Sequence, residues 1–336
     1  MRKMKNILII TIMTTFALSA SAQIDLHSHA ITKDYIDYIK ANGAELDEGF
    51  PIPAWSVEKH FAFMDEAGIQ TSVLTMPAPQ PYFGDAEASA AVCRSYNEEC
   101  AALKARYPGR FMFCAALPLP DVNAAIREAV YALDTLKADG IKLATNVYGQ
   151  YLGTPELDTL FSVLNGRGAV VILHPHRPEP VNRQVMQQTP LAMQEYLSET
   201  TRAVANMVSR NVLARYPKVK VVVPHCGAYL PLAVPRMKSL TAVMQANKMV
   251  GEIDWQANLS SLYFDLAGAH SPEVIRMMLT ITTPDHLLYG SDYPYVAPQV
   301  LVKSLQRMQQ YLTDEPDLEP YKEMILYKNA LKLFGK

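Results

Sequence analysis

Short apolar runs alternate with longer amphipathic segments along the chain after residue 22. The runs are rich in Val, Ile, Leu and Phe and lack a regular alternation of apolar and polar positions. Such runs are typical of parallel strands that are covered on both faces. The predicted strands are residues 24–29, 69–75, 111–116, 140–145, 169–173, 219–224, 262–266 and 286–290.

The segments between these runs have helical patterns, and several begin with recognisable start signals. Asp121 precedes an Ala-rich amphipathic run, and Ser271 precedes Pro272 at the first helical position. Segments 85–107 and 190–215 are also predicted to be helical. No Gly/Ser linker or charge block interrupts the strand–helix alternation, so one α/β domain is expected.

Eight strand–helix units in succession predict a single (β/α)₈ TIM barrel over residues 23–336. That length suits the fold, which typically needs about 250 residues plus insertions. The active sites of such barrels lie at the C-terminal ends of the strands. The Gly- and Pro-containing loop 42–55 follows the first strand and is therefore a candidate cover for the barrel mouth.

The first 22 residues have the pattern of a signal peptide. A basic start is followed by a short apolar stretch and then by the small residues Ser19-Ala20-Ser21-Ala22. The apolar stretch is shorter than the roughly 20 residues that a membrane span needs. We expect cleavage after Ala22 and export to the bacterial periplasm or the medium, with an uncleaved anchor as the alternative.

Charge and cysteine content limit the classes of binding partner and the kind of scaffold that are expected. The formal net charge is −2 and charges of both signs are mixed along the chain, so neither nucleic acid nor a membrane surface is expected as a partner. Four cysteines are too few for a disulfide scaffold in a chain of 336 residues. A small molecule is the expected partner, and assembly into a homodimer stays open.

Candidate metal ligands stand at the ends of four of the predicted strands. The first strand ends in His27-Ser28-His29, where side chains two residues apart project from the same face. Three later runs end in His174, His225 and Asp292. One histidine after an apolar run is more often a hydrogen-bonded core residue, and one Ser-Asp pair more often a helix cap. Their joint occurrence favours a metal site.

Four motifs carry a family resemblance over nearly the whole chain after residue 22. They are His27-x-His29, Leu173-His174-Pro175, Pro224-His225-Cys226-Gly227-Ala228 followed by Pro231 and Arg236, and Gly290-Ser291-Asp292-Tyr293-Pro294. Together they resemble the amidohydrolase superfamily of metal-dependent TIM-barrel hydrolases. More narrowly, they resemble the branch that contains aminocarboxymuconate-semialdehyde decarboxylase and the 6-methylsalicylate and resorcylate decarboxylases.

The resemblance implies a role for each motif residue. It places one divalent metal ion, usually zinc, on His27, His29, His174 and Asp292, and it makes His225 an acid/base. Mn²⁺ is the alternative metal, since imidazole and carboxylate ligands suit both ions. Asp292 is a second candidate for proton transfer.

The same resemblance gives Arg236, which lies in the motif after His225, the task of holding a substrate carboxylate. A guanidinium suits that task because it binds carboxylates through two parallel hydrogen bonds. A surface arginine on a helix is the alternative. The resorcylate type tends to have Glu in place of the first histidine, so the three-histidine version is the closer match.

Decarboxylation of a hydroxybenzoate-like or muconate-like acid is the predicted reaction. A proton from Asp292 or His225 would reach the carbon that bears the carboxylate, and CO₂ would leave. The same site could hydrolyse a lactone or an amide, or the barrel could bind a metal without catalysis. Lys142, on the fourth predicted strand, leaves a further alternative open, because other branches carry a carbamylated lysine there that bridges two metals.

Overall fold

The computed structural model describes residues 23–336, apart from residues 45, 183, 186 and 187. Eight strands form one sheet, and every pair of neighbours in it is parallel. In sheet order they are β1 (Gln23–His29), β4 (Ile69–Thr75), β5 (Phe111–Ala116), β6 (Gly140–Ala144), β9 (Val170–His174), β10 (Lys220–Val223), β11 (Leu262–Asp265) and β12 (Leu287–Leu288).

The first and last strands meet, and this contact closes the sheet. Leu26 N donates to Tyr289 O at 2.9 Å and His29 N donates to Tyr293 O at 2.8 Å. Ser28 and Tyr293 also form an isolated parallel bridge. The predicted (β/α)₈ TIM barrel is confirmed, and the eight predicted strands match the observed ones to within three residues at their ends.

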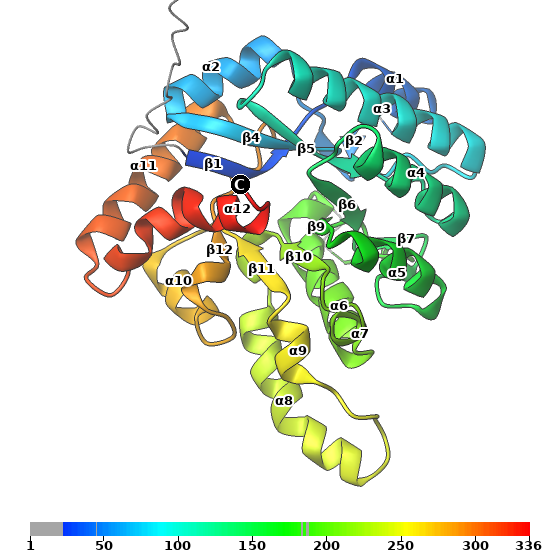
Figure 1. Cartoon of the computed structure of the whole chain (residues 1–336), viewed down its shortest axis with the longest axis vertical. Helices are drawn as coiled ribbons and strands as arrows, with labels where there is room; N and C mark the ends of the chain where they lie inside the picture. The colour runs from blue at the N-terminus through cyan, green and yellow to red at the C-terminus, as the bar shows by residue number, and fades with distance from the viewer. Residues whose placement is uncertain (1–22, 45, 183, 186–187) are drawn as a thin grey trace, which may run out of the picture.

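Helices surround the sheet in the described part of the chain (Figure 1). They are α1 (Lys33–Ala41), α2 (Val57–Ala67), α3 (Ala86–Arg106), α4 (Val122–Asp134), α5 (Asp158–Arg167), α6 (Glu195–Ser209), α7 (Val212–Arg215), α8 (Leu230–Ala246), α9 (Trp255–Leu259), α10 (Pro272–Met278), α11 (Pro298–Asp314) and α12 (Asn329–Leu333). The start signals act as expected, because the side chains of Asp121 and Ser271 accept hydrogen bonds from Ala124 N and Val274 N.

One helix prediction was wrong in its extent. Segment 190–215 is divided into a 3₁₀ turn, η2 (Leu191–Met193), and the helices α6 and α7. Asn211 interrupts the helix because its backbone is left-handed, with φ of 54°. Its side chain binds the backbone of a distant segment, since Asn211 Nδ2 donates to Glu252 O at 2.6 Å. The prediction for 85–107 is confirmed by α3.

Two layers of apolar side chains hold the barrel together. The larger layer packs the outer faces of the strands against the helices. A smaller cluster includes Val170 and Ile172, which share a strand face with His174 and therefore point into the barrel. Ala330 of α12 belongs to this inner cluster, and α12 lies across this end of the barrel in Figure 1. The inner cluster therefore forms a packed floor beneath the strand ends that carry the histidines.

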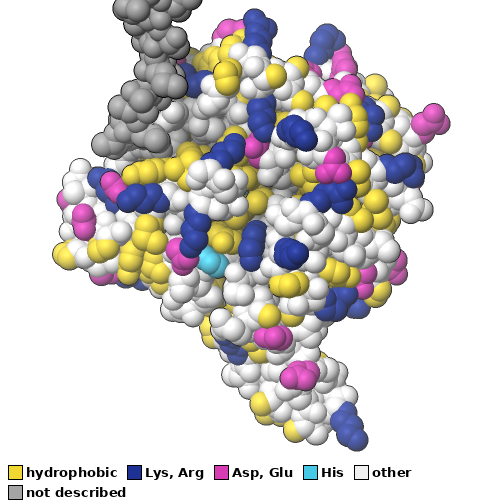
Figure 2. Space-filling view, viewed as in Figure 1, with side chains coloured by type: hydrophobic (Ala, Val, Ile, Leu, Met, Phe, Trp, Pro, Cys, Tyr) yellow, Lys and Arg dark blue, Asp and Glu magenta, His cyan; other side chains and the backbone are white. Residues whose placement is uncertain are grey.

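Helix α8 extends away from the barrel body (Figure 1). The molecular face seen in the same view carries basic and acidic side chains interspersed with apolar ones (Figure 2). Within the described residues, no helix combines the length and the apolar character that crossing a bilayer would require.

Candidate active site

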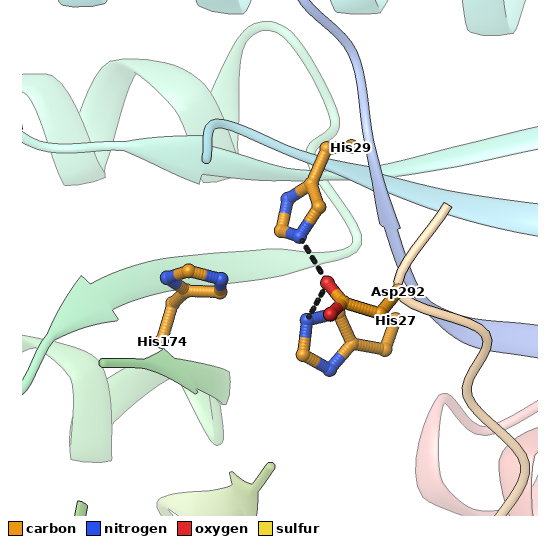
Figure 3. Close-up of side chains that lie close together, drawn as sticks. All are labelled: His27, His29, His174 and Asp292. Atoms are coloured by element: carbon orange, nitrogen blue, oxygen red, sulfur yellow. Dashed lines mark hydrogen bonds and ion pairs between the residues drawn. The ribbon is translucent and has the colours of Figure 1, made fainter. Parts of the chain in front are cut away.

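Four side chains converge at the C-terminal end of the barrel (Figure 3). His27 and His29 come from the end of β1, His174 from the end of β9, and Asp292 from the segment after β12. One nitrogen or oxygen atom from each lies within 4.8 Å of the others. Asp292 Oδ1 is 3.3 Å from His27 Nε2 and 3.2 Å from His29 Nε2. The predicted ligands therefore do form one cluster.

A separate hydrogen bond holds each histidine ring by its Nδ1 atom. His27 Nδ1 lies 2.9 Å from Asp265 Oδ2, and His174 Nδ1 lies 2.9 Å from the Pro175 carbonyl oxygen. A carboxylate and a carbonyl only accept, so in both rings Nδ1–H donates, and Nε2 is the nitrogen left to bind a cation. Such second partners fix the tautomer and orientation of metal-binding histidines.

His29 is fixed in the same way by Thr75, at the end of β4. The Thr75 hydroxyl donates to Ser28 O at 3.0 Å, so its oxygen accepts from His29 Nδ1 at 2.9 Å. The three rings therefore turn their Nε2 lone pairs toward one point. This arrangement fits a divalent cation, which takes the neutral imidazole nitrogen as its ligand.

Burial keeps two of the histidines neutral. It lowers the pKa of His29 to about 4 and holds the pKa of His174 well below its usual range. Neither ring therefore has a proton to lose when a cation binds at neutral pH. Burial also lowers the pKa of His27, but Asp265 and Asp292 outweigh it and raise that pKa well above its usual range. The two carboxylates therefore stabilise positive charge at the His27 ring.

Asp292 is a carboxylate although its side chain is only 23% exposed. Burial raises its pKa, but interactions with His225, His27 and His29 outweigh that effect and hold the pKa well below the usual range. Three imidazoles and one carboxylate are a donor set that zinc and manganese both accept. The residues present therefore fit the predicted divalent metal ion.

The backbone around Asp292 is tightly constrained. Its φ is 65°, a left-handed conformation that is uncommon outside glycine, and its N–H donates to His27 O at 2.7 Å. At Gly290, a Cβ atom would lie 2.7 Å from the Cβ of His27, so only glycine fits at this close approach to β1. The Ser291 hydroxyl donates to Asp25 at 2.5 Å, which ties the same turn to β1.

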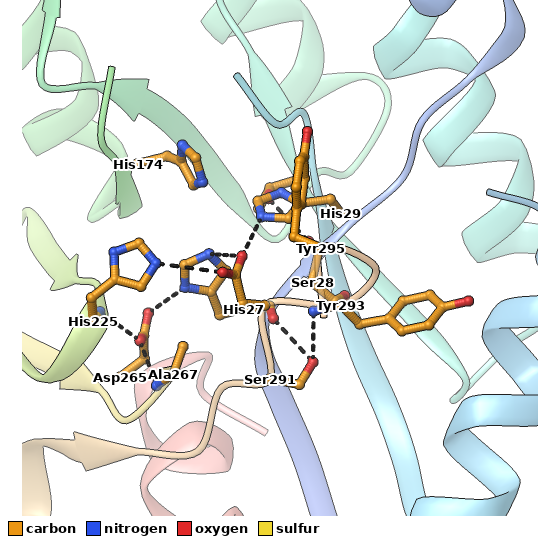
Figure 4. A network of polar contacts seen from close by, with 12 residues as sticks. His27, Ser28, His29, His174, His225, Asp265, Ala267, Ser291, Tyr293 and Tyr295 are labelled. Atoms are coloured by element: carbon orange, nitrogen blue, oxygen red, sulfur yellow. Dashed lines mark hydrogen bonds and ion pairs between the residues drawn. The ribbon is translucent and has the colours of Figure 1, made fainter. Parts of the chain in front are cut away.

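His225 lies beside this cluster and not within it (Figure 4). Its Nε2 is 3.7 Å from Asp292 Oδ2, and its side chain is 16% exposed, more than that of His27 or His29. His225, Cys226, Gly227 and Ala228 all have positive φ, so the backbone turns sharply after β10. The position suits a group that exchanges protons with a bound molecule.

Asp265, at the end of β11, links His225 to the metal cluster. Its Oδ2 accepts from His27 Nδ1, while its Oδ1 accepts from His225 N at 3.0 Å and from Ala267 N at 3.1 Å (Figure 4). Sequence reasoning missed this residue. The signal was available, because Asp265 ends an apolar predicted strand as Asp292 does.

Comparison with known proteins places the chain in a family. A family model described as amidohydrolase matches residues 24–336. The chain belongs to the amidohydrolase family. It is 32% identical to the decarboxylase yanB of Aspergillus niger over 94% of this chain and 88% of that protein. It is 30% identical to the 6-methylsalicylic acid decarboxylase of Penicillium expansum over 94% of this chain and 97% of that protein.

A solved structure gives the same fold. The 5-carboxyvanillate decarboxylase from Novosphingobium aromaticivorans, crystallised with bound manganese and 3-methoxy-4-hydroxy-5-nitrobenzoic acid, superposes with a TM-score of 0.82. It is 19% identical, over 94% of this chain and 98% of that one. Membership of the amidohydrolase family and the decarboxylase relatives support a metal-dependent decarboxylase, as the sequence motifs predicted.

A cavity of about 480 Å³ opens over the site of this amidohydrolase. His174, His225 and Asp292 line it together with Phe50 and Tyr295. Phe50 belongs to a hairpin of β2 (Leu46–Asp47) and β3 (Phe50–Pro51), within the loop 42–55. The loop therefore covers part of the mouth, as its place after the first strand indicated.

Two further predicted residues, Arg236 and Lys142, lie in different surroundings. Arg236 is exposed on α8 and does not line this cavity, so its role in holding a substrate carboxylate stays a prediction. Lys142 is buried on β6, two residues from Gly140 and Ala144 on the same strand face. Burial lowers the pKa values of His29 and His174, and the charge of Lys142 lowers them further, so Lys142 lies close to the metal cluster.

Proposed function

We propose that this amidohydrolase is a metal-dependent carboxy-lyase that removes CO₂ from a small hydroxybenzoate-like acid. The observation that carries the proposal is the cluster of His27, His29, His174 and Asp292 at the base of a cavity, with His225 beside it. Two decarboxylases that are at least 30% identical over 94% of the chain support the same reaction class.

The proposed cofactor is one divalent cation, with Zn²⁺ as the first choice and Mn²⁺ as the alternative. The donor set of three imidazoles and one carboxylate supports both ions. When bound, such a cation supplies a Lewis acid that stabilises oxygen anions on the substrate. His174 and Asp292 also line the cavity, so the cluster faces the space that a substrate would enter.

His225 is the proposed proton donor. The reaction forms a C–H bond at the ring carbon that bears the carboxylate and breaks the bond from that carbon to CO₂. Asp292 turns Oδ1 toward the histidine cluster and Oδ2 toward His225 Nε2. Asp292 can therefore hold the protonated His225 ring in place, or take part in the transfer itself. Apolar side chains make up most of the cavity lining around them, which strengthens these polar interactions.

Turnover of defined acids tests the reaction. Protein loaded with Zn²⁺ or Mn²⁺ is incubated with 6-methylsalicylate and 2,6-dihydroxybenzoate in D₂O, beside a parallel panel of lactones and amides. We expect CO₂ to be released and deuterium to be incorporated at the carbon that carried the carboxylate. The reason is that the new bond at this carbon takes its hydrogen from a group that exchanges with solvent. A chelator-treated sample is the control.

Two outcomes would contradict the decarboxylase proposal. Hydrolysis of lactones or amides, with no CO₂ from any acid, would replace it with the hydrolase alternative. Stoichiometric metal binding without turnover of any compound would favour a non-catalytic metal-binding barrel. The opening of the cluster to the cavity speaks against a closed structural metal site.

We also propose export of the protein, with residues 1–22 as a signal peptide that lies outside the described residues. The basic start, the apolar stretch and Ser19-Ala20-Ser21-Ala22 support this. Mass spectrometry of protein from the native host should find a chain that begins at or near Gln23. An intact Met1 terminus on the purified native protein would overturn the proposal.

A further inference from the structure

We propose that the substrate carries a single carboxylate and an apolar substituent several carbons long, as in an alkyl- or aryl-substituted hydroxybenzoic acid. The acid end would meet His174, His225 and Asp292, and the substituent would lie between η2 and α10. This inference rests on the proposed decarboxylase function and deepens it by naming the substrate class.

The distribution of charge in the cavity is the first argument. Ionisable groups of the lining are His174, His225, Asp292, two tyrosines and Cys226, and no Lys or Arg lies among the described lining residues. A second carboxylate on the substrate would therefore lose its hydration without gaining a cationic partner, which is costly. This favours a monocarboxylic acid over the muconate-like dicarboxylic acid that the sequence left open.

The size of the cavity is the second argument. The cavity has about 480 Å³, within the roughly 300–1,000 Å³ of sites that hold drug-sized ligands. A one-ring hydroxybenzoic acid has only about ten non-hydrogen atoms and is smaller than such ligands. The cavity therefore has room for a substituent on the ring.

The character of the outer wall is the third argument. Met193 of η2 is 69% exposed and Met277 of α10 is 38% exposed, and both line the cavity. Val274 lies one helical turn before Met277 and lines the same wall. Large apolar side chains that stay exposed around a concave site mark a binding surface, and methionine adapts its shape to varied apolar groups.

Small residues leave space beside this wall for a substituent. Ala267, Gly268 and Ala269 follow β11 and face the cavity, and Ala192 precedes Met193 on the other side. The acid-binding end is fixed by hydrogen bonds to Asp265, which accepts from His225 N and from Ala267 N. The structure therefore combines a rigid polar base with an adaptable apolar outer part, as expected for a ligand with one polar and one apolar end.

A homologous series of substrates tests the inference. The metal-loaded enzyme is assayed with salicylates that carry methyl, propyl, pentyl or heptyl groups ortho to the carboxylate, and in a second series para to it. We expect kcat/KM to rise in one series by about fourfold per methylene until the cavity is filled, which corresponds to about 0.8 kcal/mol per buried methylene. A dicarboxylic analogue of equal length should be a poor substrate.

The variant Met277→Lys tests the assigned wall. Lysine suits this partly exposed helix position, so the fold should be kept, and its charge should flatten the dependence on chain length and improve the dicarboxylic analogue. Leu232→Lys is the matched control, because Leu232 is 68% exposed on α8 and does not line the cavity. It should leave the series unchanged.

Calorimetric binding of alkylphenols to the metal-loaded protein separates this inference from the proposed reaction. Affinity that rises with chain length, without CO₂ release from any acid, would support the apolar site and overturn the decarboxylase function. Decarboxylation with a flat or falling chain-length dependence in both series would overturn the inference and keep the function. A preference for the dicarboxylic analogue would also overturn the inference.

Discussion

The variant His174→Ala should lose most of its metal, whereas the wild-type protein should bind about one divalent ion per chain. His174 is one of four residues whose ligand atoms lie within 4.8 Å of one another, and it comes from a strand remote in sequence from β1. Affinity falls steeply when one of so few ligands is removed. Elemental analysis after dialysis against a weak chelator measures the loss.

Thermal unfolding with and without added metal gives a second measure of the same variant. A cation that binds only the folded state stabilises it, so metal should raise the melting temperature of the wild-type protein and not that of His174→Ala. His286→Ala is the matched control. His286 Nδ1 bonds Leu262 O at 2.8 Å and its ring stacks on Tyr263, while the residue lies outside the four-ligand cluster.

The metal content of the variant Asp265→Asn should fall between the metal contents of His174→Ala and His286→Ala. Its amide group can face His27 Nδ1 but carries no charge, and loss of such second partners typically weakens metal binding by about 10- to 100-fold. Full metal content in His174→Ala, or full turnover by metal-free wild-type protein, would show that the metal assignment is wrong.

The variant His225→Asn should keep its metal and lose turnover by about 10²- to 10⁴-fold, the usual contribution of a positioned proton-transfer group. His225 lies 3.7 Å from Asp292 and outside the four-ligand cluster. Asparagine is the suitable replacement, because His225 has φ of 56° and asparagine adopts that conformation more readily than most residues. Metal content and single-turnover rates are measured on the same samples.

The two-metal alternative gives a different result for the same variant. If Lys142 were carbamylated, the wild-type protein would bind two ions, and both His225→Asn and Lys142→Ala would lose metal. Two ions per chain with those losses would overturn the one-metal assignment. Unchanged turnover in His225→Asn would instead remove this residue from the reaction.

The strands and the metal ligands could be predicted because both depend on local sequence patterns. Buried parallel strands give continuous apolar runs, and the barrel brings the ends of those runs together. Local patterns therefore gave His27, His29, His174, His225 and Asp292 as candidates, and the family resemblance separated His225 from the other four. The position of His225 just outside the cluster depends on the positive φ values of residues 225–228, which no local pattern specified.

The remaining features depend on contacts between distant segments. Thr75 and Asp265 hold histidines of β1. Both stand at the end of an apolar strand, but the sequence does not show which ring each of them holds. Phe50, Met193 and Met277 form the cavity wall from three loops and helix ends whose relative placement is tertiary. Asn211 interrupts a helix for two reasons, which are its intrinsic tolerance of a left-handed backbone and its hydrogen bond to Glu252 O. The hydrogen bond can be seen only in the three-dimensional structure.

The contact between β1 and the segment after β12 also sets when the protein can acquire its metal. His29 and Asp292 are 263 positions apart in the sequence. During synthesis His27 and His29 emerge first, but they lack the carboxylate until almost the whole chain has left the ribosome. A nascent chain therefore offers histidines without the carboxylate and has no complete site. If the chain crosses a membrane unfolded, the ion that it finally holds comes from the compartment where it folds and not from the one where it was made.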